Sequence, residues 1–384
     1  MKKVKIGVMG AFRGLTMIKF LMKYRDAELV AVCDKYRPAL EKVRIAAQEA
    51  GMNVALYENF DEFRQCDMEA VVLANYATEH APFAIRCLKK GLHVFSEVLP
   101  VQNMREAVEL IETVEQTGLV YAYGENYCFM PAPREMKKLY REGKIGEIQY
   151  AEGEYIHNCE PIAPRITYGD PNHWRNNAYA TFYCTHSLGP LITITGLRPV
   201  RVVGFEMNHP EEMRSLGLIG GSAGLEIVTL ENGAIFKSLH GGFKHNSPQA
   251  NYQLNGDRGA MKDLANGQIA VYTEGENENC RGKHEVYEPK PIIEASANTG
   301  HGGGDFYTTH YFIQSILGDE VARERAIDVY TAVDMCIPGI LAYKSICNDN
   351  CSVKIPNLRN KEERDAYRND TFCSFPHIAG SMYH

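Results

Sequence analysis

The stretch Val4-Lys5-Ile6-Gly7-Val8-Met9-Gly10-Ala11-Phe12-Arg13-Gly14 decides the fold of the first third of the chain. Residues 4–9 have the apolar, β-branched character of a buried strand, and glycines follow at positions 10 and 14. A turn that holds a dinucleotide needs glycine where the backbone bends and where it approaches the pyrophosphate. Gly10 and Gly14 suit these places, although Phe12 stands where a strict G-x-G-x-x-G pattern has its second glycine. The stretch predicts a strand, a cofactor turn and a helix start.

Short β-rich runs alternate with helical patterns through the rest of the first third. We predict strands at 28–33, 70–74, 92–95 and 118–123, and helices at 14–24, 38–49, 79–90 and 104–117. This alternation is typical of a parallel sheet wrapped by helices.

Asp34 ends the second predicted strand, 24 residues after Gly10. At this place a carboxylate accepts hydrogen bonds from the adenosine ribose of a dinucleotide. The carboxylate would also repel a 2′-phosphate. NAD is therefore favoured over NADP, although the nearby Lys35 and Arg37 weaken that preference.

The composition disfavours several classes of partner. The 384 residues carry a net charge of −7, with 45% hydrophobic and 23% charged residues, as expected for a globular protein of two domains. A net negative charge without a Lys/Arg cluster disfavours nucleic acid. No apolar run approaches the roughly 18 residues that span a bilayer. The eleven cysteines are scattered without zinc-like spacing, so we expect reduced thiols in a cytoplasm and no metal site.

Two segments carry a resemblance to a known family. They are Ala74-Asn75-Tyr76-Ala77-Thr78-Glu79-His80 and Gly91-Leu92-His93-Val94-Phe95-Ser96-Glu97. Both resemble the glucose–fructose oxidoreductase, inositol dehydrogenase and MocA (Gfo/Idh/MocA) family. There a strand ends in a threonine–proline turn with a histidine five residues after the threonine, and the next strand ends in a glutamate–lysine–proline motif beside the nicotinamide.

This resemblance covers essentially the whole chain and implies an α/β fold. It implies an N-terminal Rossmann domain, residues 1–123, and a substrate-binding C-terminal α/β domain, residues 124–384. The second domain would contain a large, mostly antiparallel open sheet. Because that sheet commonly forms the subunit interface in the family, we expect a homo-oligomer.

The departures from the family pattern bear on the reaction. Asn75-Tyr76 stands where threonine–proline is usual, and Val98 replaces the lysine that helps handle substrate protons in many members. Phe182 occupies the place of an aspartate four residues before a histidine, here His186. Valine and phenylalanine cannot take the hydroxyl proton that a plain alcohol dehydrogenase removes as hydride leaves.

Four further matches resemble the branch called glycoside hydrolase family 109, whose members use NAD to cleave glycosidic bonds. They are Glu125 in Glu125-Asn126-Tyr127, the pair Tyr155 and His157, Thr185-His186-Ser187-Leu188-Gly189-Pro190, and His301-Gly302-Gly303-Gly304-Asp305-Phe306. The resemblance implies that Glu125 is an active-site glutamate. Ser187 and Gly304 are small departures from the branch pattern.

The residues themselves permit such chemistry. Tyr155 and His157 stand two apart on a predicted strand, 148–157, so their side chains point to one face, although such a pair is also common as packing. His186 lies near a helix start, where the dipole favours a neutral imidazole that can act as a base. Trp174 and Arg175 can stack on and hydrogen-bond a sugar, although a lone tryptophan more often lies in a core or interface.

These arguments give a full set of candidate residues. We predict cofactor contacts from Gly10, Phe12, Arg13, Gly14, Asp34, Asn75, His80 and Glu97, substrate contacts from Trp174, Arg175, His301 and Asp305, and catalysis by Glu125, Tyr155, His157 and His186. His301 and Asp305 flank three glycines, so we expect them to be close in space.

The favoured reaction is transient oxidation of a sugar or glycoside. NAD would take hydride from a sugar carbon, taken as C3, and the ketone would acidify the C2 hydrogen. The C1 substituent would leave by elimination, water would add and the hydride would return. One alternative is a net dehydrogenase or epimerase of sugars or inositols that releases NADH. Another is a catalytically silent dinucleotide sensor, which Phe12 and Val98 favour.

Overall fold

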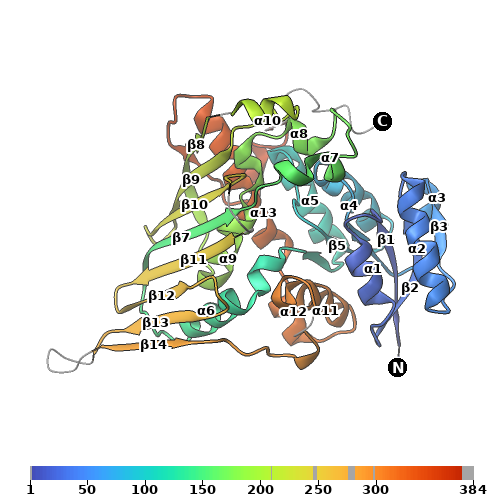
Figure 1. The fold of residues 1–384 in the computed structure, drawn as a ribbon, viewed down its shortest axis with the longest axis horizontal. Coiled ribbons are helices and arrows are strands. Elements are labelled where there is room, and N and C mark those ends of the chain that lie inside the picture. The colour runs from blue at the N-terminus through green and yellow to red at the C-terminus, as the bar shows by residue number, and fades with distance from the viewer. Residues whose placement is uncertain (1, 209, 245–248, 276–281, 297–298, 374–384) are drawn as a thin grey trace.

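The computed structural model describes residues 2–208, 210–244, 249–275, 282–296 and 299–373. They form two sheets, with helices packed between and around them (Figure 1). A six-stranded sheet occupies the first third of the chain, and the strands of a nine-stranded sheet come from the remainder.

The first sheet is parallel throughout, with the strand order β3-β2-β1-β4-β5-β6. Its strands are β1 (Val4–Met9), β2 (Ala27–Cys33), β3 (Ala55–Tyr57), β4 (Ala70–Leu73), β5 (His93–Ser96) and β6 (Tyr121–Tyr123). The order reverses between β1 and β4. A nucleotide binds outside the carboxyl ends of the strands at such a switch point.

Helices cover both faces of this sheet, which explains why β4 is buried along its whole length. One face is covered by α1 (Leu15–Leu21), α2 (Arg37–Glu49) and the late α11 (Gly304–Ile316). The other is covered by α3 (Phe60–Phe63), α4 (His80–Lys89) and α5 (Met104–Thr117). The Rossmann prediction is confirmed. The predicted boundary at 123/124 stays a prediction, because α11 returns from late in the chain to pack on the first sheet.

The second sheet is open and mostly antiparallel, as predicted, with the order β14-β13-β12-β11-β7-β10-β9-β8-β15. Among the described pairs, β10 and β7 are parallel and the others antiparallel. Its strands are β7 (Ile148–Ile156), β8 (Pro199–Glu206), β9 (Ala223–Leu230), β10 (Ile235–Gly241), β11 (Gln249–Gly256), β12 (Gly259–Asp263), β13 (Ile269–Thr273), β14 (Lys283–Tyr287) and β15 (Val353–Lys354).

The remaining helices lie mostly between the two sheets or at the top of the view in Figure 1. They are α6 (Pro131–Arg141), α7 (Ala163–Ile166), α8 (Trp174–Asn177), α9 (Thr185–Thr195), α10 (Glu211–Ser215), α12 (Glu320–Arg325), α13 (Val329–Ile346) and α14 (Lys361–Asp365). Short 3-10 turns include Ala77–Glu79, Asn126–Phe129, Glu160–Ile162, Ala180–Tyr183, Glu294–Ser296 and His301–Gly303.

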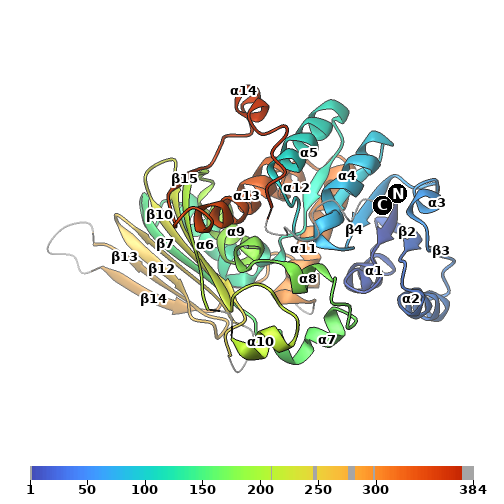
Figure 2. The ribbon, with the colours of Figure 1, turned by 90° about the horizontal axis from the view of Figure 1, so that it is seen from above.

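One face of the second sheet carries α9 and α13, and α6 packs against α9 (Figure 2). No described helix covers the opposite face (Figure 2). The segment Glu320–Ile346 is long and apolar enough to cross a membrane, but 72% of its most apolar window is buried inside the fold. α13 contacts both β8 and α5, so it is a core helix that joins the two halves.

The close packing of α9 on β7 brings His186 and Tyr155 together. A Cβ at Gly153 would lie 1.9 Å from the carbonyl oxygen of Ser187, so only glycine lets the helix lie this close to the strand. The Ser187 and Ser238 hydroxyls lie 2.8 Å apart and join α9 to the neighbouring strand β10. The first turn of α9, which carries His186, is thereby pressed against the strand that carries Tyr155.

Candidate active site

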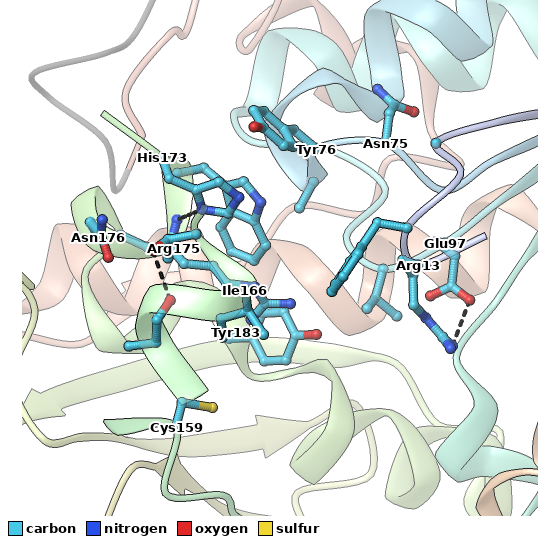
Figure 3. A pocket seen from close by; sticks show the side chains of 18 of the residues that line it. Arg13, Asn75, Tyr76, Glu97, Cys159, Ile166, His173, Arg175, Asn176 and Tyr183 are labelled. Carbon is cyan, nitrogen blue, oxygen red and sulfur yellow. Dashed lines mark hydrogen bonds and ion pairs between the residues drawn. The ribbon is translucent and has the colours of Figure 1, made fainter. Parts of the chain in front are cut away.

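A cleft of about 990 Å³ lies between the two sheets. One side is lined by the turn after β1 and the ends of β2, β4 and β5, and the other side by β7, α8, α9 and the end of β10. Figure 3 shows Arg13, Asn75 and Glu97 on the first side and Arg175 and Tyr183 on the second. The cleft thus contains the switch point of the first sheet.

The turn after β1 makes the cofactor end of the cleft. Gly10 has φ +94°, and a Cβ there would lie 2.3 Å from the carbonyl oxygen of Ala74, so this position accepts only glycine. Asp34 sits beside the turn, where its carboxylate accepts from the backbone N–H groups of Ala11 at 2.6 Å and Tyr36 at 2.8 Å. A glycine turn and a carboxylate at this switch point fit the pyrophosphate and ribose of NAD.

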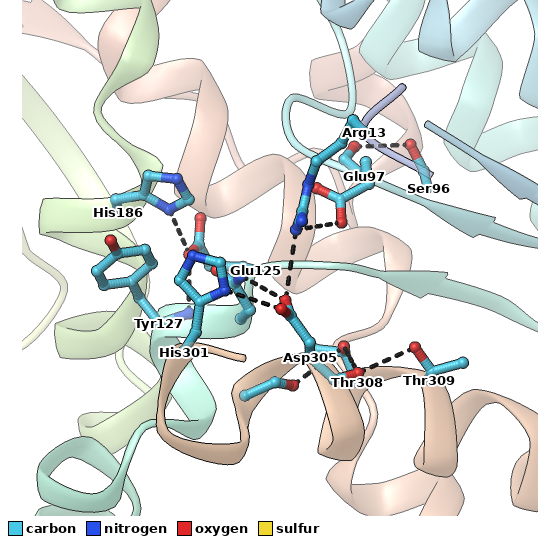
Figure 4. A network of polar contacts seen from close by, with 12 residues as sticks. Arg13, Ser96, Glu97, Glu125, Tyr127, His186, His301, Asp305, Thr308 and Thr309 are labelled. Atoms are coloured by element: carbon cyan, nitrogen blue, oxygen red, sulfur yellow. Dashed lines mark hydrogen bonds and ion pairs between the residues drawn. The ribbon is translucent and has the colours of Figure 1, made fainter. Parts of the chain in front are cut away.

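Arg13 reaches from the turn into the centre of the cleft. Its guanidinium donates to Glu97 at 2.8 Å and lies 3.4 Å from Asp305 (Figure 4). The charge of Glu97 raises the pKa of Arg13. Burial raises the pKa of Glu97, and the Arg13 charge opposes that effect. A single charged network therefore joins Arg13 and Glu97, which we predicted to contact the cofactor, to Asp305, which we predicted to contact the substrate.

His301 and Asp305 are close in space, as their spacing predicts. The Nδ1 of His301 and the Oδ2 of Asp305 lie 2.8 Å apart, and Asn126 donates to Asp305 at 2.8 Å. The hydrogen bond with Asp305 raises the pKa of His301. Burial alone would raise the pKa of Asp305, but the bond from His301 and the charge of Arg13 outweigh it and lower that pKa.

His186 and Glu125 form a second pair, and the Tyr127 ring contacts the histidines of both pairs. The Nδ1 of His186 lies 2.6 Å from the Oε1 of Glu125, whose side chain is fully buried (Figure 4). Tyr127 N–H donates to the same Glu125 oxygen at 3.3 Å, and Tyr252 donates to the His186 carbonyl at 2.6 Å. A neutral imidazole that donates from Nδ1 to Glu125 presents Nε2 as a base.

Tyr155 and His157 share one face, as predicted, and both line the cleft. The Tyr155 hydroxyl lies 2.8 Å from Nδ1 of His157. Burial and the neighbouring phenols of Tyr183 and Tyr127 raise the pKa of Tyr155 well above its usual value. Burial, followed by Arg175, lowers the pKa of His157. The neutral imidazole of His157 therefore accepts from the protonated phenol of Tyr155.

Tyr127 and Tyr183 complete this aromatic wall, and neither was predicted. The Tyr127 ring lies 4.4 Å from the His186 ring and 5.3 Å from the Tyr155 ring. Tyr183 lies 5.1 Å from His186. A sequence signal existed for both: Tyr127 follows Glu125 by two residues, and Tyr183 precedes His186 by three, which is one helical turn.

Trp174 and Arg175 line the cleft, as their predicted role requires. The Arg175 guanidinium lies 4.4 Å from the Trp174 ring and 5.5 Å from the Tyr183 ring. Trp174 is only 6% exposed. Its stack fixes Arg175 beside Tyr183, so Arg175 is the better placed of the two to donate to a sugar (Figure 3).

The remaining predicted cofactor residues divide into two groups. Phe12, Asn75 and Glu97 line the cleft. His80 instead lies in the core, with Nδ1 2.8 Å from the Leu99 carbonyl oxygen, so it supports the loop after Glu97 from behind. Gly14 lies behind the turn, where a Cβ would meet the Gly10 carbonyl oxygen at 2.1 Å.

In the described part of the chain, no cluster of three or more His, Cys, Asp or Glu residues could hold a metal.

Comparison with known proteins agrees with this geometry. Residues 4–125 match the oxidoreductase family with an NAD-binding Rossmann fold, and residues 243–362 match the glycosyl hydrolase 109 C-terminal domain. The chain is thus similar to the Gfo/Idh/MocA oxidoreductase family in its first third and to the glycosyl hydrolase 109 branch in its second half, as its motifs predict.

Relatives of this family resemble the chain over most of its length. A glycosyl hydrolase family 109 protein of Stenotrophomonas maltophilia (strain K279a) is 23% identical, over 93% of this chain and 89% of its own. An alpha-N-acetylgalactosaminidase of Shewanella oneidensis is 22% identical, over 93% and 85%. Levoglucosan dehydrogenase, solved with NADH and L-sorbose, has a TM-score of 0.74 at 15% identity, covering 93% of this chain and 100% of that one. The chain is therefore an enzyme of the NAD-dependent oxidoreductase type, with NAD as its cofactor.

Proposed function

We propose that this enzyme cleaves the glycosidic bond of a sugar by transient oxidation, with no net consumption of NAD. The proposal rests on two hydrogen-bonded pairs on one wall of the cleft, Tyr155–His157 and His186–Glu125. Each pair can take up and release a proton. A plain dehydrogenase needs one base, whereas oxidation followed by elimination must move two different protons.

Bound NAD supplies one function, which is to accept a hydride from the sugar, at C3 in this proposal, and later to return it. Gly10 and the neighbouring turn would hold its pyrophosphate, and Asp34 would hold its adenosine ribose. Arg13 and Glu97, joined by an ion pair in the centre of the cleft, would line the wall next to the reacting carbon.

Tyr155 and His157 handle the hydroxyl proton of the sugar in this proposal. The phenol of Tyr155 stays protonated, and it already donates to the neutral His157. It can therefore take a proton from the sugar hydroxyl while passing its own to Nδ1 of His157. The same relay runs backwards when the hydroxyl forms again.

His186 removes the second proton, the one on C2. The C3 ketone makes this hydrogen acidic, and Nε2 of His186 takes it while the buried Glu125 stabilises the resulting imidazolium. The electrons of the C2–H bond form a double bond to C1 as the C1–O bond breaks, and the leaving oxygen takes a proton from water and departs as the alcohol. Water then adds to C1, C2 regains a proton, and the balance is one glycoside and one water consumed.

The described residues give little support to a direct hydrolysis by two carboxylates. Such enzymes place two carboxyl groups on either side of the glycosidic bond. Here Glu125 is fully buried behind His186, and Asp305 is occupied by Arg13, His301 and Asn126. The groups that face the cleft around Tyr155 are imidazoles and phenols instead.

The test is a panel of nitrophenyl α- and β-glycosides, beginning with N-acetylgalactosaminides because one relative is named for that activity. Nitrophenol release and NADH absorbance are followed together on protein of known NAD content. Release without net NADH, lost in Tyr155→Phe and His186→Ala, supports the proposal. Steady NADH formation from free sugars or inositols, with no nitrophenol, would establish the net dehydrogenase instead.

We also propose that the protein is a cytoplasmic homo-oligomer that pairs through the uncovered face of the second sheet. Apolar side chains alternate onto that face from three neighbouring strands, among them Val203, Phe205, Leu225, Ile227 and Leu239. Phe205 is 39% exposed. Light scattering on the native protein and on Ile227→Lys tests the pairing, because a monomeric native protein would contradict it.

A further inference from the structure

Three aromatic residues stand at places in the cofactor half where the dinucleotide pattern does not require them. Phe12 occupies the second-glycine position, Tyr36 follows Asp34 by two residues, and Tyr76 occupies the usual proline position. Phe12 and Tyr36 are 44% and 48% exposed. Side chains of this size on the rim of a cleft indicate contacts with a ligand or with another segment.

All three contact one segment of the second domain, residues 163–177, which contains α7 and α8 and which we call the strap. The Tyr168 ring lies edge-on to Phe12 at 5.4 Å and tilted against Tyr36 at 5.0 Å. The His173 ring lies 4.7 Å from Tyr76 (Figure 3). The strap thus crosses the cofactor half of the cleft and packs there on the three aromatic residues.

Tyr168 is held at its place by an uncommon backbone conformation. Its φ is +56°, in the left-handed region that few residues other than glycine adopt, and Gly169 follows at +69°. This turn aims the ring at the first domain. Burial, followed by the charge of the nearby Asp34 carboxylate, raises the pKa of the Tyr168 phenol, so its hydroxyl is neutral.

We propose that Tyr168 binds the adenosine end of NAD, so that the second domain holds the cofactor together with the first. The Tyr168 ring touches Phe12, on the pyrophosphate turn, and Tyr36, whose N–H donates to Asp34. It therefore bridges the two sides of the groove in which the adenosine lies. An aromatic face there stacks on adenine or packs on the ribose, as aromatic rings do on flat ligands.

The bridge also explains the aromatic departures. Phe12 weakens the fit to the strict glycine pattern, but it gives Tyr168 a partner across the groove. A cofactor enclosed in this way leaves slowly, which suits a reaction that returns its hydride in every cycle. The inference rests on NAD as the cofactor and not on glycoside cleavage, so either can fail without the other.

The test measures cofactor dissociation without any sugar. The protein is loaded with NADH, excess NAD is added, and the loss of bound-NADH fluorescence gives the dissociation rate. Tyr168→Asn removes the ring but keeps a residue that tolerates the left-handed backbone, and Tyr168→Phe keeps the ring as the matched control. We expect Tyr168→Asn to release NADH about tenfold faster than the native protein and Tyr168→Phe to behave as native.

Reduced nicotinamide mononucleotide, which lacks the adenosine, shows whether the substitution acts at the adenosine end or at the nicotinamide end of the cofactor. Native protein and Tyr168→Asn should bind it with equal affinity, because the ring acts on the missing part. The proposal is overturned if Tyr168→Asn releases NADH within twofold of the native rate. It is also overturned if the mononucleotide weakens by the same factor as NADH, since the substitution would then act on the nicotinamide end.

Discussion

Two histidine–carboxylate pairs lie beside each other against the Tyr127 ring, and they differ in how many hydrogen bonds and ion pairs the carboxylate makes (Figure 4). Asp305 is bonded by His301, Asn126 and Arg13. Glu125 holds His186 at 2.6 Å, and its second oxygen, Oε2, is buried without a hydrogen-bond partner among the described residues.

The difference shows how one pair of residue types can have two roles. Asp305 shares the Arg13 guanidinium with Glu97 and also binds His301, so its pair belongs to a fixed charge network at the junction of the two domains. Among the residues that the structure describes, the ion-pair partner of Glu125 is His186, which becomes a cation only when it takes a proton. An unneutralised carboxylate stabilises that imidazolium, so His186–Glu125 is the pair suited to act as a base.

Removing the charge of Glu125 should have the largest effect. Glu125→Gln keeps the size of the side chain but no longer stabilises a protonated His186. We expect turnover of an active nitrophenyl glycoside to fall about 10²- to 10⁴-fold, with NADH affinity unchanged. Steady-state kinetics and NADH titration measure both. A variant that retained more than a tenth of native turnover would refute the assigned role of Glu125.

Asp305→Asn is the matched change in the other pair and should have a smaller effect. We expect turnover to fall about tenfold, in the range of a lost positioning contact. The pKa of His301 should also fall, because the hydrogen bond to Asp305 is what raises it. NMR titration of the histidine C–H signals measures that shift. An unchanged His301 pKa, or a turnover loss equal to that of Glu125→Gln, would remove the contrast between the pairs.

His80 shows what burial does to a histidine whose ring is hydrogen-bonded to a backbone carbonyl, and it predicts a stability effect. Burial lowers the pKa of His80 from 6.5 to about 4. Between these two values the unfolded chain takes up a proton at His80 and the folded chain does not. The free energy of unfolding should therefore be intact above pH 6.5 and fall as the pH drops towards 4, by about 3 kcal/mol at most.

Denaturant unfolding of native protein and His80→Asn at several pH values tests this. The difference in unfolding free energy between the two proteins should change across pH 6.5 to 4, with the variant less sensitive to acid. Parallel pH profiles for both proteins would show that His80 titrates normally in the folded state.

The sequence predicted the parts of the fold that depend on local pattern. Residues 104–117 have strong helical periodicity, and α5 spans the same residues. The turn at Gly10 and the shared face of Tyr155 and His157 followed from glycine chemistry and strand alternation. β3 and α3 were not predicted, because three and four residues are too few to show a period.

Contacts between residues that are far apart in the sequence could not be predicted from local sequence pattern. Nothing near Tyr168 in the sequence indicates that its ring meets Phe12, 156 positions earlier. His80 was predicted from a motif as a cofactor contact, but burial in the core decided its position. The Glu125–His186 bond likewise depends on how closely α9 packs on β7, which Gly153 permits and no motif states.

The most direct test of the central claim is hydrolysis of an active glycoside in D₂O, with the deuterium at C2 of the released sugar measured by NMR. Removal of the C2 proton by His186 predicts that deuterium appears at C2 of the product, with no net NADH. A released sugar that carries only hydrogen at C2 would contradict oxidation and elimination, and would point to direct displacement at C1.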